Sequence, residues 1–250
     1  MEARSTVSQR IDALAALDPS GGHDCAPQIL KTLKDRSPSI RTNAVQLIKL
    51  HSIISLLPQV EDRLEDSRWL VRTEAAVCIG EILEPSGKPH SGLRKLLKDP
   101  NWVVRIDAME SLAMLEDLGA MTQIAKLLKD ENGIVRSYAA TILSEKCGHT
   151  YKPQISKLLQ TENDPHGRLG FLAALFSMGD RHLLPQLLDF LQSEVYQVRC
   201  AVIHNLEDLP LNEAERSTIV KAFLKLRRKE PTIAVKSTIT TALKTLRKAA

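Results

Sequence analysis

The chain has few aromatic residues and no long apolar segment. Aromatic residues make up only 4% of its 250 positions, so leucine, isoleucine, valine and alanine must fill any core. The longest apolar cluster, residues 53–57, is far shorter than the roughly 20 residues that a membrane-spanning helix needs. Residues 1–5 lack the apolar segment of a secretory signal peptide. We therefore expect neither a membrane protein nor a secreted one.

The four cysteines form no paired motif. Cys25, Cys78, Cys147 and Cys200 are far apart in the sequence, which argues against a disulfide framework and against a zinc motif. Cys78 falls on an apolar helical stripe, so a buried reduced thiol is the expected state. Unpaired cysteines of this kind are typical of a reducing, cytoplasmic environment.

Motifs that would identify an enzyme are also missing. The chain contains no glycine-rich phosphate loop, no His-Glu-x-x-His and no Gly-x-Ser-x-Gly. Its seven histidines form no local metal-ligand pair. The sequence therefore predicts a non-enzymatic chain with no catalytic residues, no cofactor and no metal site.

What the sequence does contain is one short pattern, repeated along nearly its whole length. An apolar residue followed by a basic one recurs, and the basic residue occupies positions 41, 72, 105, 136, 168, 199 and 236. The first six of these positions lie 31 to 33 residues apart, and a fixed period of this size is the signature of a helical solenoid. An acidic residue precedes most copies and an alanine follows most of them, at Asp35, Asp66, Asp99 and Asp130 and at Ala44, Ala75, Ala108 and Ala139.

The register Asp-x4-Val-Arg-x2-Ala, preceded by Pro-Gln-Ile at 27–29 and 153–155, resembles the short HEAT-like repeats named after phycobilin lyases. The resemblance implies an all-α fold, a right-handed α-solenoid of about seven HEAT-like helical pairs plus a terminal helix. We expect one solenoid over 1–250, with an N-terminal cap unit at 1–36, regular repeats at 37–210 and a basic C-terminal cap at 211–250. The first helices of the pairs are expected near 38–50, 68–83, 101–115, 132–146, 166–178, 195–208 and 231–248. The second helices are expected near 53–64, 90–98, 119–129, 150–160, 181–192 and 212–228.

The recurring arginine and aspartate predict a structural ladder between repeats. Each arginine is placed to bond the preceding turn and the aspartate of its own or a neighbouring repeat, at Asp35, Arg41, Asp66, Arg72, Asp99, Arg105, Asp130, Arg136 and Arg199. The alternative is a row of phosphate-binding arginines. The fifth copy has Thr161 at the acidic position and Phe171 at the small one, so we expect a kink or looser packing there.

The second helices carry recurring glutamine and lysine three residues apart, which puts both on one helix face. In HEAT-like solenoids the second helices line the concave surface, and the resemblance therefore implies that these residues line a partner-binding groove. The alternative is a merely solvated face. The predicted binding residues are Gln28, Lys31, Gln59, Asp62, Lys95, Gln123, Lys126, Gln154, Lys157 and Gln186.

Two further features suggest contacts with a partner. Trp69 and Trp102 occupy the same position in consecutive repeats and are candidate aromatic anchors, although packing across the turn between repeats would also explain them.

The C-terminal segment is rich in basic residues. From Arg216 onward it contains ten basic residues and a single acidic one, Glu230. This segment therefore carries a net charge of +9, and since the whole chain carries +4, the preceding residues sum to −5. It either holds an anion or forms the polar outer face of a cap.

We interpret the chain as a protein-protein interaction scaffold that binds an acidic or amide-rich partner. The first alternative is a DNA-binding or DNA-glycosylase-like HEAT protein, with the two tryptophans, Lys95, Lys126 and Asp62 imitating a base-binding cleft. The net negative charge before Arg216 argues against it, because duplex binding needs concentrated positive charge. The second alternative, a bilin lyase-like subunit, depends on the resemblance alone.

Overall fold

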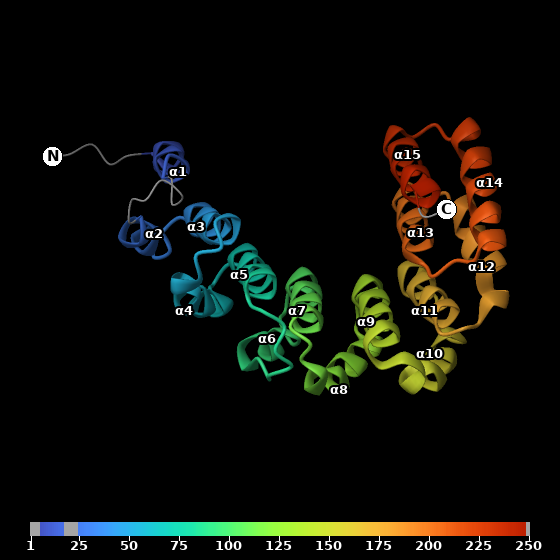
Figure 1. Cartoon of the computed structure of the whole chain (residues 1–250), viewed down its shortest axis with the longest axis horizontal. Coiled ribbons are helices and arrows are strands. Elements are labelled where there is room, and N and C mark those ends of the chain that lie inside the picture. Colours follow the sequence, from blue (N-terminus) through green and yellow to red (C-terminus); the bar gives the residue numbers. More distant parts are fainter. Residues whose placement is uncertain (1–5, 18–24, 249–250) are drawn as a thin grey trace. The chain divides into compact units, whose positions relative to one another are not determined.

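The computed structural model describes residues 6–17 and 25–248, and within these ranges it contains helices and turns but no strand. The chain divides into two compact units, Met1–Gln123 and Ile124–Ala250. Each unit is a stack of helical pairs (Figure 1). The all-α fold of paired helices is thus confirmed, whereas the division into one solenoid with two caps stays a prediction. Residues 1–5, on which the absence of a signal peptide was argued, lie outside the described ranges.

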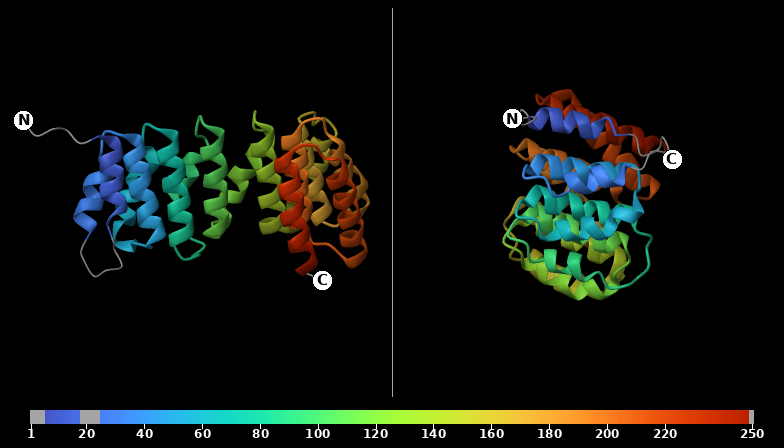
Figure 2. Two further views of the ribbon diagram at one scale, coloured as in Figure 1. Left: turned by 90° about the horizontal axis from the view of Figure 1, so that it is seen from above. Right: turned by 90° about the vertical axis from the view of Figure 1, so that its left-hand side faces the viewer.

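In the first unit, one layer holds the first helix of each pair and a second layer holds the other. Neighbouring helices of the first layer pack along their lengths and run nearly parallel (Figure 2). The first layer consists of α1 (Val7–Ala15), α3 (Pro38–Leu50), α5 (Trp69–Ile82) and α7 (Trp102–Met114). The second consists of α2 (Ala26–Thr32), η1 (Ile54–Leu56), α4 (Leu57–Glu61), η2 (Asp62–Glu65), α6 (Ser91–Leu96) and η3 (Leu118–Ala120), followed by α8 (Met121–Ile124) at the unit boundary.

The second unit repeats this plan. Its first layer consists of α9 (Gly133–Cys147), α11 (Pro165–Ser177), α13 (Tyr196–Asp208) and α15 (Ile233–Lys248). Its second layer consists of η4 (Ala125–Lys129), η5 (Gly148–Tyr151), α10 (Lys152–Leu159), η6 (Arg181–Leu183), α12 (Leu184–Asp189), η7 (Phe190–Gln192) and α14 (Glu213–Lys229). The predicted first-layer helices match these bounds within two residues at every end. Most second helices are instead short α-helices flanked by 3₁₀ turns.

The core lies between the two layers and between neighbouring first-layer helices. The recurring apolar pair of the second helices is buried, as Ile29 with Leu33 and Leu93 with Leu97 show, except that Leu159 of the fifth copy is half-buried. A first-layer helix inside the stack is covered on two flanks and on its back, so it is apolar almost all round. In α11, for example, every residue from Leu169 to Phe176 is buried.

Each unit bends toward its first layer. In Figure 1, α3, α5 and α7 lie on the inner side of the first unit, and α4 and α6 lie on the outer side. The second unit shows the same order, with α11 and α13 inside and α12 and α14 outside. The expectation that the second helices line the concave side is therefore wrong within each unit. The physical reason is that first-layer neighbours pack directly on one another, whereas second-layer neighbours make few mutual contacts.

Candidate functional site

The ladder arginines join successive repeats in the first unit. Arg41 Nη1 donates to the carbonyl oxygen of Asp35 at 2.8 Å, while its Nε and Nη2 each donate to a carboxylate oxygen of Asp66 at 2.7 Å. Arg72 likewise donates to the Asp66 carbonyl at 2.8 Å and to the Asp99 carboxylate at 2.6 and 2.7 Å. Each guanidinium therefore bonds the backbone of its own repeat and the carboxylate of the next one, a bidentate geometry that favours one stacking angle.

The second unit builds the same contact from glutamates. Arg136 donates to the Asp130 carbonyl at 2.7 Å and to the Glu162 carboxylate at 2.6 and 2.8 Å. Arg199 donates to the Glu230 carboxylate at 2.8 and 2.7 Å. The hydrogen bond from Arg199 lowers the pKa of Glu230, which is buried. These guanidinium groups are engaged in the structure, which argues against a phosphate-binding row.

Two further arginines of the pattern also contact the backbone. Arg105 Nη1 donates to the Asp99 carbonyl at 2.7 Å. Arg168, in the degraded fifth copy, donates to the Leu159 carbonyl at 3.2 Å.

The fifth repeat keeps both the acid and the close packing. Glu162, one residue beyond Thr161, supplies the carboxylate that Arg136 contacts. Gly170 supplies the small residue, because a Cβ built there would lie 2.4 Å from the Cα of Ser137. Phe171 is buried beside it. The expected looser packing is therefore wrong, since a one-residue shift within the repeat replaces each missing group.

The predicted binding residues of the second layer divide by exposure. Gln59, Gln123 and Gln154 are half-buried, and Gln154 Nε2 donates to the Ala125 carbonyl at 3.4 Å. Gln154 therefore joins neighbouring second-layer segments, and all three glutamines are only partly available to a partner. The other predicted residues are exposed, namely Gln28, Lys31, Asp62, Lys95, Lys126, Lys157 and Gln186.

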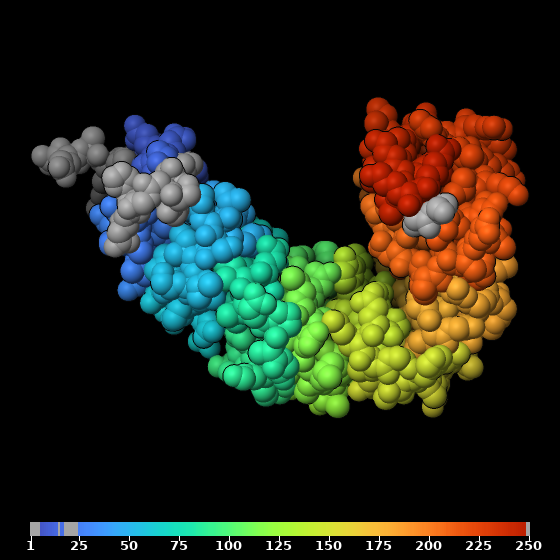
Figure 3. Space-filling view, viewed as in Figure 1, coloured from blue at the N-terminus to red at the C-terminus, as the bar shows by residue number. Residues whose placement is uncertain are grey.

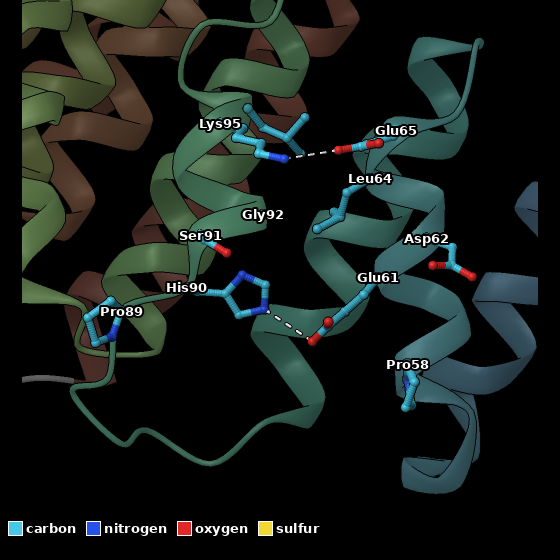
Figure 4. A pocket seen from close by; sticks show the side chains of 11 residues that line it. Pro58, Glu61, Asp62, Leu64, Glu65, Pro89, His90, Ser91, Gly92 and Lys95 are labelled. Atoms are coloured by element: carbon cyan, nitrogen blue, oxygen red, sulfur yellow. Dashed lines mark hydrogen bonds and ion pairs between the residues drawn. The ribbon is translucent and has the colours of Figure 1, made fainter.

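A groove of about 490 Å³ lies between α4–η2 and α6, and two predicted residues, Asp62 and Lys95, line it (Figure 4). Two further carboxylates, Glu61 and Glu65, line the same wall as Asp62. Lys95 Nζ donates to Glu65 Oε1 at 3.2 Å, but both side chains are more than 70% exposed, so this pair contributes little. The groove therefore carries more acidic than basic charge.

The α6 wall of the groove is held by a buried carboxylate. Asp117 accepts from the backbone N–H of His90 at 3.1 Å and from Arg94 Nε at 2.7 Å. Burial raises the pKa of Asp117, but the hydrogen bonds from Arg94 and His90 outweigh it and lower that pKa. His90 Nδ1 in turn accepts from the Leu93 N–H and caps α6. The repeat pattern did not indicate this contact, because Arg94 occurs in one repeat only, although Asp180 repeats Asp117 at the start of η6 and accepts from Lys152 Nζ at 2.7 Å.

An apolar hollow of about 460 Å³ adjoins the groove and shares Pro89 and His90 with it. Ile54, Leu83 and Leu115 are among its lining residues, and Ile54 is 66% exposed. Side by side, the acidic groove and the apolar hollow offer a polar and a hydrophobic contact within the first unit.

The two tryptophans are exposed but do not line the groove. Trp69 and Trp102 are the first residues of α5 and α7, and each is 39% exposed. Leu70 beside them is 52% exposed. The first unit thus brings Asp62 and Lys95 together in one groove and leaves the tryptophans on the first turns of the other layer. This differs from the base-binding cleft considered from the sequence.

The described residues contain no group of histidine, cysteine or acidic side chains suited to a metal ion. All four cysteines are free, and burial raises the pKa of the Cys78 thiol to about 12, so this thiol stays protonated. No helix in the described ranges has the length and apolar character needed to cross a bilayer.

Comparison with known proteins gives the family. The model of HEAT repeats matches residues 26–113, 57–143, 90–175 and 121–207, overlapping stretches that cover most of the chain. The chain belongs to the HEAT repeat family. A search of curated proteins found no match.

Solved structures of similar fold include a chain from the complex of CpcE and CpcF of phycocyanin lyase from Nostoc sp. PCC7120. That similarity covers 94% of this chain and 98% of the other, at 16% identity and a TM-score of 0.60. Another is an archaeal HEAT-like repeats protein from Thermococcus onnurineus NA1, with 98% of both chains covered, 16% identity and a TM-score of 0.40. At 16% identity the likeness to the chain from the lyase complex shows the fold and not the activity.

Proposed function

We propose that this HEAT repeat chain is a non-enzymatic scaffold that binds a partner protein on the outer face of its second helical layer. The observation that carries the proposal is the groove between α4–η2 and α6. Its α6 wall is fixed by the Asp117 hydrogen bonds, while Asp62 and Lys95 inside it stay exposed. A fixed backbone with free polar side chains binds at low entropic cost.

The charges of the layer indicate a partner of mixed character. Glu61, Asp62 and Glu65 suit a lysine or arginine side chain entering the groove, because opposite charges steer association and fix register. Elsewhere in the layer, exposed Lys126 and Lys157 suit the acidic or amide-rich segment expected from the sequence. Such surface charges contribute mainly to the association rate and to specificity.

Most of the binding free energy would come from apolar contacts. Interfaces depend on a few buried aromatic or apolar anchors surrounded by polar contacts. The hollow lined by Ile54, Leu83 and Leu115 can receive such an anchor from the partner. Trp69 and Trp102 supply a second apolar contact if the partner reaches the first turns of α5 and α7.

The proposal is tested by capturing a partner on the wild-type chain and measuring its affinity by calorimetry. Asp62→Lys with Glu65→Lys should weaken binding at least tenfold, because it reverses the charge of the groove. Glu145→Lys with Glu194→Lys makes the same change of charge at exposed positions of the other unit, in a first-layer helix and in a turn, and it should retain the affinity. Equal affinity of both double variants would refute the groove as the binding site.

A lyase subunit is the second candidate, because the fold resembles a chain of the phycocyanin lyase complex. It predicts that the chain binds a bilin, or transfers one to a protein together with a second subunit. A visible absorption band after incubation with bilin and gel filtration would favour this candidate over the scaffold.

A further inference from the structure

Helix α14 presents a row of basic side chains to solvent. Lys221, Lys225 and Arg228 are spaced four and three residues apart, so they share one face of the helix, and all three are exposed. The opposite face carries Ile219 and Phe223, which are fully buried. At 1.5 Å per residue, the row extends about 10 Å along the helix. Figure 3 shows α14 and α15, coloured orange to red, at the surface of the second unit.

No nearby acid neutralises this row. Between Arg216 and Lys248 the only carboxylate is Glu230, and its two oxygens are bound to Arg199 inside the core. The acids of α14 itself lie in its first turn, at the far end of the helix from the row. No ion pair to Lys221, Lys225 or Arg228 is found among the described residues. The basic excess seen in the sequence is therefore available at the surface.

The basic row of α14 also lacks the apolar and aromatic side chains that a protein interface needs. The centre of such an interface is depleted of charged residues and contains aromatic or apolar anchors. The one large apolar side chain strongly exposed between residues 213 and 248 is Ile233, at the start of α15. The absence of exposed aromatic rings in this segment also removes the platform on which single-stranded bases stack. Contacts to the phosphates of a duplex need neither feature, because positive charge dominates them.

We propose that the exposed face of α14 binds the phosphate backbone of a double-stranded nucleic acid, independently of base sequence. A duplex carries one negative charge per about 1.7 Å of its axis, so the row spans about six phosphates. Lys225 and its two neighbours in the row reach these oxygens from one side of the helix. Arg227 and Lys229, also exposed, extend the positive surface at the end of α14. This site shares no residue with the groove of the first unit.

The test is the anisotropy of a labelled 20-base-pair DNA duplex of arbitrary sequence, titrated with the full chain at several salt concentrations. We expect a dissociation constant of about 10⁻⁴ to 10⁻⁶ M, typical of sequence-independent binding. The affinity should fall steeply with salt, with a slope of about −0.9 for each phosphate neutralised. Replacing Lys221, Lys225 and Arg228 by glutamine should reduce the magnitude of the slope by about three. The glutamine variant keeps helix propensity and solubility.

The control replaces three exposed lysines of the first unit, Lys34, Lys88 and Lys98, by glutamine. It removes the same net charge and should leave the slope unchanged. An equal effect of both triple variants would overturn the assignment to α14, and so would no binding to the duplex at 50 mM salt. Tighter binding to a poly-glutamate peptide, or to vesicles containing phosphatidylserine, than to the duplex would overturn the choice of nucleic acid. Circular dichroism before each titration verifies that the variants are folded.

Discussion

At the scale of single residues, an arginine that connects two repeats through a buried ion pair differs in stability contribution from an arginine without such a pair. The side chains of Arg199 and Glu230 are 10% and 1% exposed. Leaving one member of such a pair without its partner is costly, because the remaining charge stays buried. Arg168 shows the contrast, since its described contact is one hydrogen bond to the Leu159 carbonyl.

Replacing Arg199 by alanine should therefore lower the free energy of unfolding by about 3 to 5 kcal/mol. Replacing Arg168 by alanine is the matched control and should cost only about 1 kcal/mol. Urea unfolding followed by circular dichroism measures both. The double change of Arg199 and Glu230 to alanine should cost less than the sum of the single changes. If Arg199→Ala costs no more than Arg168→Ala, the ladder does not hold the repeats together.

Asp107 is a carboxylate whose burial lowers the free energy of unfolding at neutral pH. Burial, together with the nearby charge of Glu74, raises its pKa to about 6. Its pKa is higher in the folded than in the unfolded chain, so the folded state binds the proton more tightly. The aspartate therefore reduces stability as pH rises from about 4 to 6, and the full reduction persists at neutral pH.

Asp107→Asn should accordingly raise the thermal midpoint at pH 7.5, and the gain should disappear near pH 4. Asparagine keeps the shape and the hydrogen-bonding ability of the side chain while removing its charge. Melting curves of wild type and variant at the two pH values provide the measurement. Glu84→Gln, at an exposed position, removes a charge without relieving burial and should show no such dependence. The same gain at both pH values would mean that the carboxylate charge is not its cause.

At the scale of helices, glycine decides how closely two first-layer helices approach. Gly80 of α5 faces Ser111 of α7, and Gly170 of α11 faces Ser137 of α9. A Cβ at Gly80 would lie 2.9 Å from the Cα of Ser111, a distance that atoms of a folded chain avoid. These two contacts bring the helix backbones together and help to explain why each unit bends toward its first layer.

Gly170→Ala should lower the free energy of unfolding by about 1 to 3 kcal/mol, because α9 and α11 must move apart. Intrinsic helix propensity alone would favour alanine by about 1 kcal/mol, so the sign of the change tests the packing. The exposed Ser177→Ala in the same helix is the control and should be nearly neutral. A stabilised Gly170→Ala variant would show that α9 and α11 can accommodate the added methyl group without moving apart.

The second-layer helices show where repeat periodicity stops being informative. The sequence pattern predicted their positions, but it did not predict that most would be broken by 3₁₀ turns. Nor did it predict the Asp117 hydrogen bonds that hold α6, since their donor Arg94 occurs in one repeat only. A residue that appears in a single repeat carries no periodic signal, and its partner becomes visible only in three dimensions.

At the scale of the whole molecule, repetition creates surface as well as core. In each repeat the apolar residues and the arginine contact the neighbouring repeats, and the outer face of the second helix is exposed to solvent. In both units that face carries exposed lysines, Lys95 in the first and Lys126 and Lys157 in the second. The function proposed for the chain depends on this division.

Reversing Lys95, Lys126 and Lys157 to glutamate should weaken binding of the captured partner, mainly by slowing association, without unfolding the chain. Surface plasmon resonance at two salt concentrations separates the association and dissociation rates. The matched control reverses Lys34, Lys98 and Lys146, which are also exposed and line neither the groove nor the hollow. Unchanged kinetics in the first variant would remove these lysines from the interface.

The sequence by itself determined the order and length of the first-layer helices, the two-layer pairing and the residues of the ladder. These features follow from local periodicity, because residues three and four apart share a helix face and each repeat copies the same solution. The tertiary structure decided that Arg41, Arg72, Arg136 and Arg199 each take the carboxylate of the next repeat. It also decided that Glu162 and Gly170 compensate for the degraded fifth copy. It also decided that the second layer lies on the outer side of each unit and that one groove forms there. Such features depend on how side chains that are distant in sequence pack between helices, and the spacing of residues along the sequence does not determine those contacts.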